Sequence, residues 1–115
     1  MRRCYATIRT RSMNKTEGRY EQYLELERRG GLILSYAFQP EGLRLATKTF
    51  YYPDFRVVTA DGIVQFHDVK PAQRSGTYYS TDDALVKIKL AAELHPYAFL
   101  IAWPSKGGQW CRKEI

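Results

Sequence analysis

Cysteine is scarce in this sequence, which has two among its 115 residues, Cys4 and Cys111. So few cysteines exclude a small secreted domain that several disulfides hold together. Two cysteines and two histidines without any paired spacing also argue against a zinc site. We therefore expect reduced thiols, and with them a cytoplasmic location.

Long hydrophobic runs are absent too. No apolar segment follows Met1-Arg2-Arg3 as a secretion signal would, and no stretch approaches the length of a membrane span, so we expect no membrane partner. The hydrophobic fraction of 44% and the aromatic fraction of 14% are typical of a compact globular chain. A chain of 115 residues is long enough for one core but not for two, so the sequence predicts a single domain over residues 1–115.

Acidic residues are outnumbered, with 12 Asp and Glu against 18 Lys and Arg, which gives a formal net charge of +6. A small basic domain attracts polyanions, and nucleic acid is the commonest one inside cells. The alternative is a basic surface that serves solubility alone. Residues 1–13 carry part of this charge through Arg2, Arg3, Arg9 and Arg11, and we expect either an edge strand or a flexible arm. Such an arm is by default a solvated terminus, and the alternative is that it contacts phosphates.

The most informative stretch runs from residue 51 to residue 70 and predicts a β-hairpin. Two β-rich runs flank Ala60-Asp61-Gly62, and an Asp-Gly pair between such runs is a strong hairpin signal. Side chains alternate between the faces of a strand, so Asp68 and Lys70 share one face. The hairpin also brings Asp54, at the start of the partner strand, towards the level of Asp68. Two carboxylates and one lysine are therefore expected to converge.

This convergence suggests a site for a hard divalent cation. Mg²⁺ prefers oxygen ligands and usually takes one or two protein carboxylates, with water and phosphate oxygens completing the shell. Asp54 and Asp68 supply the carboxylates, and the Val69 carbonyl is a candidate third oxygen. Lys70 beside a metal-bound water can orient the nucleophile or offset negative charge on a phosphate in the transition state. The set is typical of a metal-dependent phosphodiesterase.

The same residues carry a resemblance to a known family. Pro53-Asp54, a spacer of thirteen residues and then Asp68-Val69-Lys70 resemble the PD-(D/E)xK signature of the restriction-endonuclease-like nuclease superfamily. The surrounding sequence is similar to that of small phage-encoded endonucleases of that superfamily. The resemblance covers residues from about 14 to about 103 and includes Asn14-Lys15-Thr16-Glu17, Phe38-Gln39-Pro40 and Tyr52-Pro53-Asp54-Phe55.

The resemblance implies a DNA endonuclease that depends on Mg²⁺ or Mn²⁺, with Asp54 and Asp68 as metal ligands and Lys70 positioning the attacking water. It implies products with a 5′-phosphate and a 3′-hydroxyl. For a phage-encoded protein the expected location is the cytoplasm of the host cell. A domain this small has little surface for reading bases, so we expect cleavage of branched or junction DNA by a homodimer.

A helix is expected from Glu17 to Arg29, with Thr16 as its N-cap and Gly30-Gly31 at its end. Glu17 would lie on the core-facing edge of the first turn. In the nucleases that this chain resembles, a glutamate of the first helix completes the metal site, and Glu17 is the matching residue. The alternatives are that Glu17 only complements the helix dipole, or that Glu21 takes its place one turn later.

The remaining elements complete an α/β pattern. Strands are expected over residues 32–39, 43–49 and 97–103, a second helix from Thr81 to Leu94, and a last short strand around Trp110-Cys111. The order predicts a three-layer α/β sandwich, in which two helices flank a central, mixed, mostly antiparallel sheet. The resemblance implies the same restriction-endonuclease-like core.

The loop over residues 71–80 follows Lys70 directly and has no periodicity. Its basic and aromatic side chains suit DNA contact by charge and stacking. The residues expected to contact nucleic acid are Arg74, Tyr78 and Tyr79 of this loop, Lys87 of the second helix, and Gln39 at a strand end, although Gln39 serves equally well as a turn-capping amide.

Two other classes of function stay open at this point. A nucleic-acid-binding module without catalysis would share the charge and the loop, but would not need Asp54, Asp68 and Lys70 together. A phage protein that acts on RNA or on a host partner is the second alternative.

Overall fold

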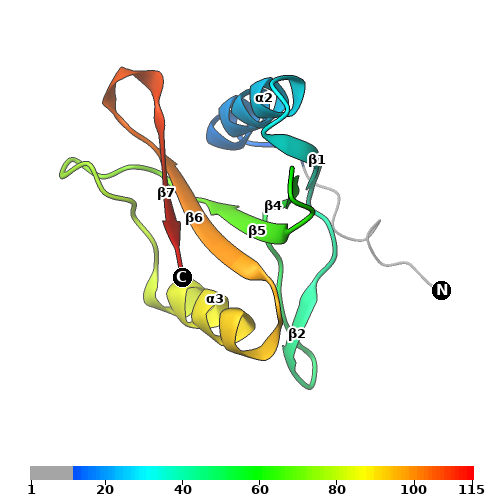
Figure 1. The fold of residues 1–115 in the computed structure, drawn as a ribbon. Helices are drawn as coiled ribbons and strands as arrows, with labels where there is room; N and C mark the ends of the chain where they lie inside the picture. Colours follow the sequence, from blue (N-terminus) through cyan, green and yellow to red (C-terminus); the bar gives the residue numbers. More distant parts are fainter. Residues whose placement is uncertain (1–11) are drawn as a thin grey trace.

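Residues 12–115 are described by a computed structural model, in which a five-stranded sheet lies between two helices (Figure 1). The sheet order is β1-β4-β5-β6-β7, with β5 and β6 parallel and the other pairs antiparallel. The predicted α/β layering with a mixed, mostly antiparallel sheet is therefore confirmed. The elements are α2 (Lys15–Arg29), β1 (Ile33–Phe38), β2 (Leu43–Ala46), β3 (Thr49–Tyr51), β4 (Phe55–Thr59), β5 (Val64–Val69), α3 (Asp82–Leu94), β6 (Ala98–Pro104), the 3₁₀ turn η1 (Lys106–Gly108) and β7 (Trp110–Glu114).

Some expectations concern residues that the structure does not describe. The basic stretch at the start of the chain, with its four arginines, and Cys4 lie outside the described residues. Cys111 in β7 is a free cysteine. No helix in residues 12–115 has the length and the apolar character needed to cross a membrane.

Helix α2 begins with a reciprocal cap. The side chain of Asn14 accepts a hydrogen bond from the Glu17 N–H at 2.8 Å, and the side chain of Glu17 accepts one from the Asn14 N–H at 3.1 Å. This capping box satisfies two N–H groups that no helical carbonyl can reach. The prediction that Thr16 is the N-cap was wrong, because Asn14 stands three residues before a glutamate and takes that role.

The hairpin of β4 and β5 forms as predicted. Phe55 pairs with His67, and Gly62 in the turn has a φ of 85°, a left-handed conformation that glycine adopts without steric cost. The single strand expected over residues 43–49 is instead two short strands, β2 and β3, which form their own two-stranded sheet. The turn between them places Lys48 at a φ of 59°. No glycine, proline or asparagine marks that turn, so the sequence pattern does not reveal it.

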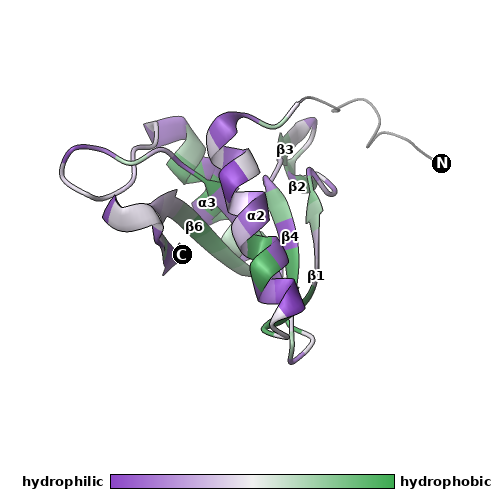
Figure 2. Ribbon diagram, turned by 90° about the horizontal axis from the view of Figure 1, so that it is seen from above, coloured by the Kyte–Doolittle hydropathy of each residue, from purple (hydrophilic) through white to green (hydrophobic). Residues whose placement is uncertain are grey.

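Two hydrophobic clusters hold the layers together, one under each helix. Under α2, Tyr20 and Leu24 pack with Phe55 and Val57 of β4, and under α3, Ile88 and Ala91 pack with Phe66, Phe99 and Ile101. In Figure 2, β6 is hydrophobic along most of its length, as expected for a strand covered on both faces.

A buried polar network ties α2 to the sheet. The Tyr20 hydroxyl lies 2.6 Å from Nδ1 of the fully buried His67. The same hydroxyl accepts a hydrogen bond from Nε of Arg112 at 2.8 Å. Arg112 also forms a bidentate ion pair with Glu27 of α2. Burial, and then the Arg112 charge, lower the pKa of His67 to about 3, so its ring is neutral. Nε2 of the ring lies 2.9 Å from Oε1 of Gln65, which can only accept, so Nε2 carries the proton and Nδ1 accepts from the Tyr20 hydroxyl.

The first prediction concerns this network. We expect Tyr20→Phe to lower the free energy of unfolding by about 1–3 kcal/mol, because it leaves the buried His67 and Arg112 nitrogens without the oxygen between them. Tyr36→Phe is a matched control, because it removes a hydroxyl that donates to Glu25 in a part-buried position. It should lower the free energy of unfolding by less than Tyr20→Phe does. Urea denaturation measures both. Equal losses in the two variants would contradict a special role for the network.

Candidate active site

Asp54 lies where the chain passes from the small sheet into β4, and its backbone is held on both sides. Its N–H donates to the His67 carbonyl at 3.2 Å, and its carbonyl accepts from the Gln39 N–H at 2.7 Å. Pro53, immediately before it, is among the largest fully buried side chains. These contacts place Asp54 beside the end of β5, as the hairpin pattern predicted.

Asp68 is held in β5 by contacts to both of its carboxylate oxygens. The Tyr51 hydroxyl donates to Oδ2 at 2.9 Å, and Nζ of Lys70 lies 3.0 Å from Oδ1. The side chains of Lys70 and Asp68 are only 16% and 10% exposed. The backbone N–H of Val69 donates to Oδ2 of Asp54 at 2.8 Å, which ties Asp54 across the hairpin to the residue that follows Asp68. The predicted convergence of Asp54, Asp68 and Lys70 is thus present in the fold.

Glu17 reaches the same place from α2. Its side chain is buried and lines one cavity with Asp54, Asp68 and Lys70. The capping box therefore has a second consequence, since it holds the glutamate at the helix start next to the sheet. Glu21 does not line this cavity. Of the two helix glutamates considered from the sequence, Glu17 is the one positioned at the site.

The cavity has a volume of about 360 Å³ and opens to solvent. Sequence reasoning missed four of its residues, and three of these come from the β3 segment that precedes Asp54. The tyrosine hydroxyl that bonds Asp68 is one of them. The sequence signal for these three is the aromatic run Phe50-Tyr51-Tyr52 before Pro53, and no signal points to the fourth, Ala84 of α3. The full lining is Glu17, Phe50, Tyr51, Tyr52, Asp54, Asp68, Val69, Lys70, Ala84 and Lys87.

Negative charge is crowded in this cavity. Burial first, then the charge of Asp68, and more weakly that of Glu17, raise the pKa of Asp54 to about 8, against the opposing effect of the Val69 N–H. Burial and the neighbouring Asp68 carboxylate also raise the pKa of Tyr51, so its hydroxyl keeps its proton and donates. Ionised carboxylates packed this closely are stabilised by an added cation.

The donor set suits a hard cation, although the acidic side chains do not by themselves form a complete cage. Among residues 12–115, no group of three or more Asp, Glu, His or Cys side chains is arranged to hold a metal ion. Mg²⁺ and Mn²⁺ need fewer protein ligands, because water and phosphate oxygens complete the shell. Asp54 and Asp68 provide carboxylate oxygens with spare lone pairs, and Val69 lines the same cavity.

Of the residues predicted to contact nucleic acid, one lines the cavity and the others lie outside it. Lys87 lines the cavity, whereas Arg74 and Tyr79 are exposed on the loop after Lys70. Tyr78 is half-buried, with its ring 5.1 Å from that of Trp103. Gln39 lies at the end of β1 with a φ of 46° and contacts the Asp54 backbone rather than lining the cavity.

The raised pKa of Asp54 makes stability depend on pH. Between its ordinary value of 3.8 and the folded value of about 8, the folded protein holds a proton that the unfolded chain has lost. The stability from this proton is fully present below pH 3.8, decreases progressively as the pH rises, and is lost above pH 8. In EDTA, the wild type should lose free energy of unfolding between pH 5 and pH 8 that Asp54→Asn does not lose. The difference between the two proteins should therefore shift in favour of Asp54→Asn by on the order of 2–4 kcal/mol over this range.

Urea titrations at several pH values measure this difference. Asp61→Asn is the control, because Asp61 is exposed in the β4–β5 turn and should leave the pH dependence unchanged. Parallel curves for Asp54→Asn and the wild type would show that Asp54 does not carry a raised pKa.

Comparison with models of protein families, with curated proteins and with solved structures found no match to this chain.

Proposed function

We propose that this chain is a metal-dependent endonuclease that hydrolyses phosphodiester bonds in DNA. The observation that carries the proposal is one open cavity in which Asp54 and Asp68 lie across the β4–β5 hairpin and Lys70 contacts Asp68 at 3.0 Å. A lysine held against a carboxylate at the end of a strand, with a second acid opposite, is the arrangement that the PD-(D/E)xK resemblance implies. With the separate β2–β3 sheet left aside, the order of α2, three antiparallel strands (β1, β4 and β5), α3 and the parallel strand β6 supports a restriction-endonuclease-like core.

The chain's own residues have distinct roles in this proposal. Asp54, Asp68 and the Val69 carbonyl would hold Mg²⁺ or Mn²⁺, with Glu17 close enough to add charge. A bound divalent ion lowers the pKa of water and offsets charge on the phosphate. Lys70 is fixed by Asp68 and directs its ammonium at the attacking water or the phosphate oxygens. Hydrolysis joins the water oxygen to phosphorus and releases the 3′ oxygen as a hydroxyl.

Three features support a nucleic acid as the substrate, and the resemblance to endonucleases favours DNA. The chain carries a formal net charge of +6, which favours contact with phosphates. Lys87 lies at the cavity itself. Phe50 and Tyr52 are 37% and 41% exposed at the same cavity, where they are available to stack on bases. We extend the proposal to branched or junction DNA and to a homodimer as the active form.

A panel of substrates tests this function. Purified protein is incubated with supercoiled plasmid, linear duplex, a four-way junction and RNA, each with Mg²⁺, Mn²⁺ or EDTA. We expect metal-dependent cleavage of DNA, fastest on the junction, and light scattering should report a dimer. Tight binding to DNA without cleavage in any condition would replace the nuclease by a binding module. Cleavage of RNA alone would assign the cavity to a ribonuclease.

Metal addition should also stabilise the fold. A cation that binds only the folded state contributes about 2.7 kcal/mol at a hundredfold excess over its dissociation constant. We therefore expect millimolar Mn²⁺ or Mg²⁺ to raise the melting temperature of the wild type, and Asp54→Asn to lose most of that rise. The exposed-site variant Asp61→Asn should keep it. A wild-type melting temperature that does not respond to either metal would contradict the site.

A further inference from the structure

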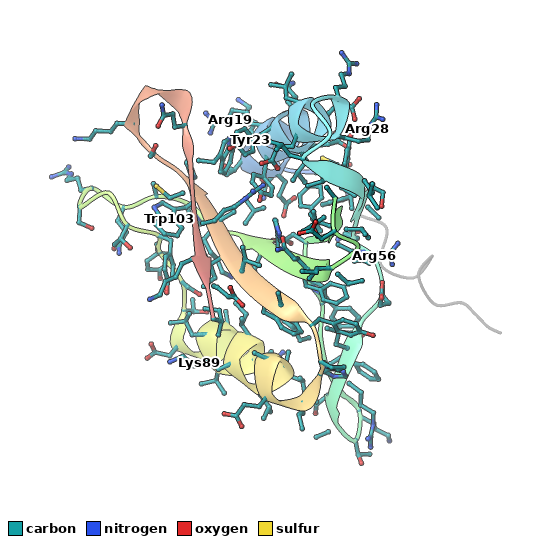
Figure 3. The ribbon with its side chains drawn as sticks, viewed as in Figure 1. Arg19, Tyr23, Arg28, Arg56, Lys89 and Trp103 are labelled. Carbon is teal, nitrogen blue, oxygen red and sulfur yellow. The ribbon has the colours of Figure 1, made fainter. Side chains whose placement is uncertain are left out.

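A second cleft, separate from the candidate active site, lies between α2 and the hairpin of β6 and β7. Its volume is about 330 Å³. Figure 3 shows Arg19 and Tyr23 on the side of α2 that faces this hairpin. The cleft combines aromatic rings, a guanidinium and a side-chain amide, a set that no part of the proposed catalysis uses. Its lining is Arg19, Gln22, Tyr23, Leu26, Pro104, Ser105, Gly108 and Trp110.

The cleft lies at the same end of the sheet as the candidate active site, where β5 and β6 terminate. Strands β5 and β6 are parallel, and Val69 pairs with Ala102, so Pro104 follows just beyond the level of Lys70. Helix α2 borders both places, because Glu17 lines the catalytic cavity and residues 19–26 line the cleft. At 1.5 Å per residue, the middle of that segment is on the order of 10 Å along the helix from Glu17, a span of about three nucleotides in a duplex strand.

Two aromatic rings in the cleft form a supported platform. The ring centroids of Tyr23 and Trp110 are 6.4 Å apart, with an angle of 38° between the planes. Behind them, the Arg112 guanidinium lies 5.3 Å from the centre of the Tyr23 ring, and Trp110 packs 4.7 Å from Tyr20. Because these contacts fix both rings, either ring can receive a flat ligand with little loss of side-chain entropy.

The polar residues of the cleft suit a nucleotide. Arg19 is exposed and forms no ion pair with another residue of the described range 12–115, so its guanidinium is available to the face of a base. Gln22 offers an amide that can both donate and accept hydrogen bonds at a base edge.

We propose that this cleft binds an unpaired nucleobase of the DNA strand whose phosphate lies in the catalytic cavity. The base stacks on Tyr23 or Trp110, and Arg19 contacts the other face of the base. A paired base keeps both faces inside the helix stack, so only a base released at a branch, a junction or a single-stranded end can enter. This inference rests on the proposed nuclease function, and it gives that function a physical reason to select branched DNA.

Trp110 provides a direct signal for occupancy. The chain has two tryptophans, and Trp103→Phe leaves Trp110 as the single emitter. In EDTA, this variant is titrated with short oligothymidylate and with an abasic oligonucleotide of the same length. We expect the thymine-containing strand to quench Trp110 emission and to bind roughly 5- to 100-fold more tightly, the range expected for one stacked base. Equal quenching by both strands, or no quenching, would overturn the proposal.

Arg19→Ala, made in the single-tryptophan background, tests the cleft without removing the rings that support the core. We expect it to reduce the affinity ratio between the two strands severalfold. Lys89→Ala is the matched control, because it removes one exposed positive charge from α3, away from the cleft, and should leave the ratio unchanged. A ratio that Arg19→Ala does not alter would also count against the cleft.

The two proposals fail in different ways. If the wild type cuts DNA with metal but Trp110 does not distinguish the two strands, the cleft assignment is wrong and the nuclease remains. If the protein neither binds oligonucleotides nor cuts any DNA, both proposals are wrong. Base-dependent quenching together with metal-dependent cleavage supports both.

Discussion

Asp68→Asn is expected to lower the rate of metal-dependent DNA cleavage by at least about 10²–10³, the usual cost of removing one electrostatic group at a reacting centre. The neutral amide keeps the size of the side chain but loses the charge that attracts a hard cation. It also removes the negative charge that holds Nζ of Lys70 at 3.0 Å. DNA binding in EDTA should survive or tighten, because one repulsive charge near the phosphates is gone.

The comparison with Asp61→Asn separates a local from a general effect. Both changes remove one negative charge, but Asp61 is exposed in the β4–β5 turn and Asp68 is buried at the cavity. Gel-based cleavage rates and a fluorescence-anisotropy titration measure the two activities. If Asp68→Asn cuts as fast as Asp61→Asn, in protein free of host nuclease, the active site has been assigned to the wrong residues.

Lys70→Ala is the second large effect, with an expected loss of about 10²–10³ in the cleavage rate. Unlike the aspartate change, it should leave the metal-induced rise in melting temperature roughly intact, since a protonated lysine is not a cation ligand. Lys70→Arg should recover little of the rate, because a planar guanidinium does not replace a compact, movable ammonium. The two variants, Lys70→Ala and Lys70→Arg, together distinguish a positioned ammonium from positive charge alone.

An exposed lysine provides the control for this series. Lys113 on β7 is exposed, does not line the cavity, and should tolerate replacement by alanine with little change in rate. If Lys70→Ala retains the wild-type rate, or if it abolishes the metal-dependent rise in melting temperature, the role given to Lys70 is wrong.

The hairpin and its acidic pair were predictable because they depend on short-range rules. The period of two along β5 fixes Asp68 and Lys70 on one face, and the Asp-Gly turn fixes the register that sets Asp54 opposite. The two helices follow from periodicity and caps, although the cap of α2 is Asn14 and not Thr16. In each case the information lies within about ten residues of the element.

The parts that the sequence did not reveal depend on contacts between distant segments. Tyr51 reaches Asp68 only because an unmarked turn at Lys48 folds β3 back beside the site. The network of Tyr20, His67 and Arg112 joins three elements, and nothing in local pattern predicts a buried histidine that stays neutral. The second cleft likewise requires α2 to meet the last hairpin, which sequence spacing does not encode.

The most direct test of the central claim is metal add-back. Protein dialysed against EDTA is mixed with supercoiled plasmid and with a four-way junction, and cleavage is followed before and after Mn²⁺ is added in excess. The account predicts intact DNA in EDTA, cleavage once Mn²⁺ is present, and no cleavage by Asp68→Asn treated in parallel. Cleavage that proceeds equally well in EDTA, or DNA that stays intact in Mn²⁺, would contradict a metal-dependent nuclease built on Asp54, Asp68 and Lys70.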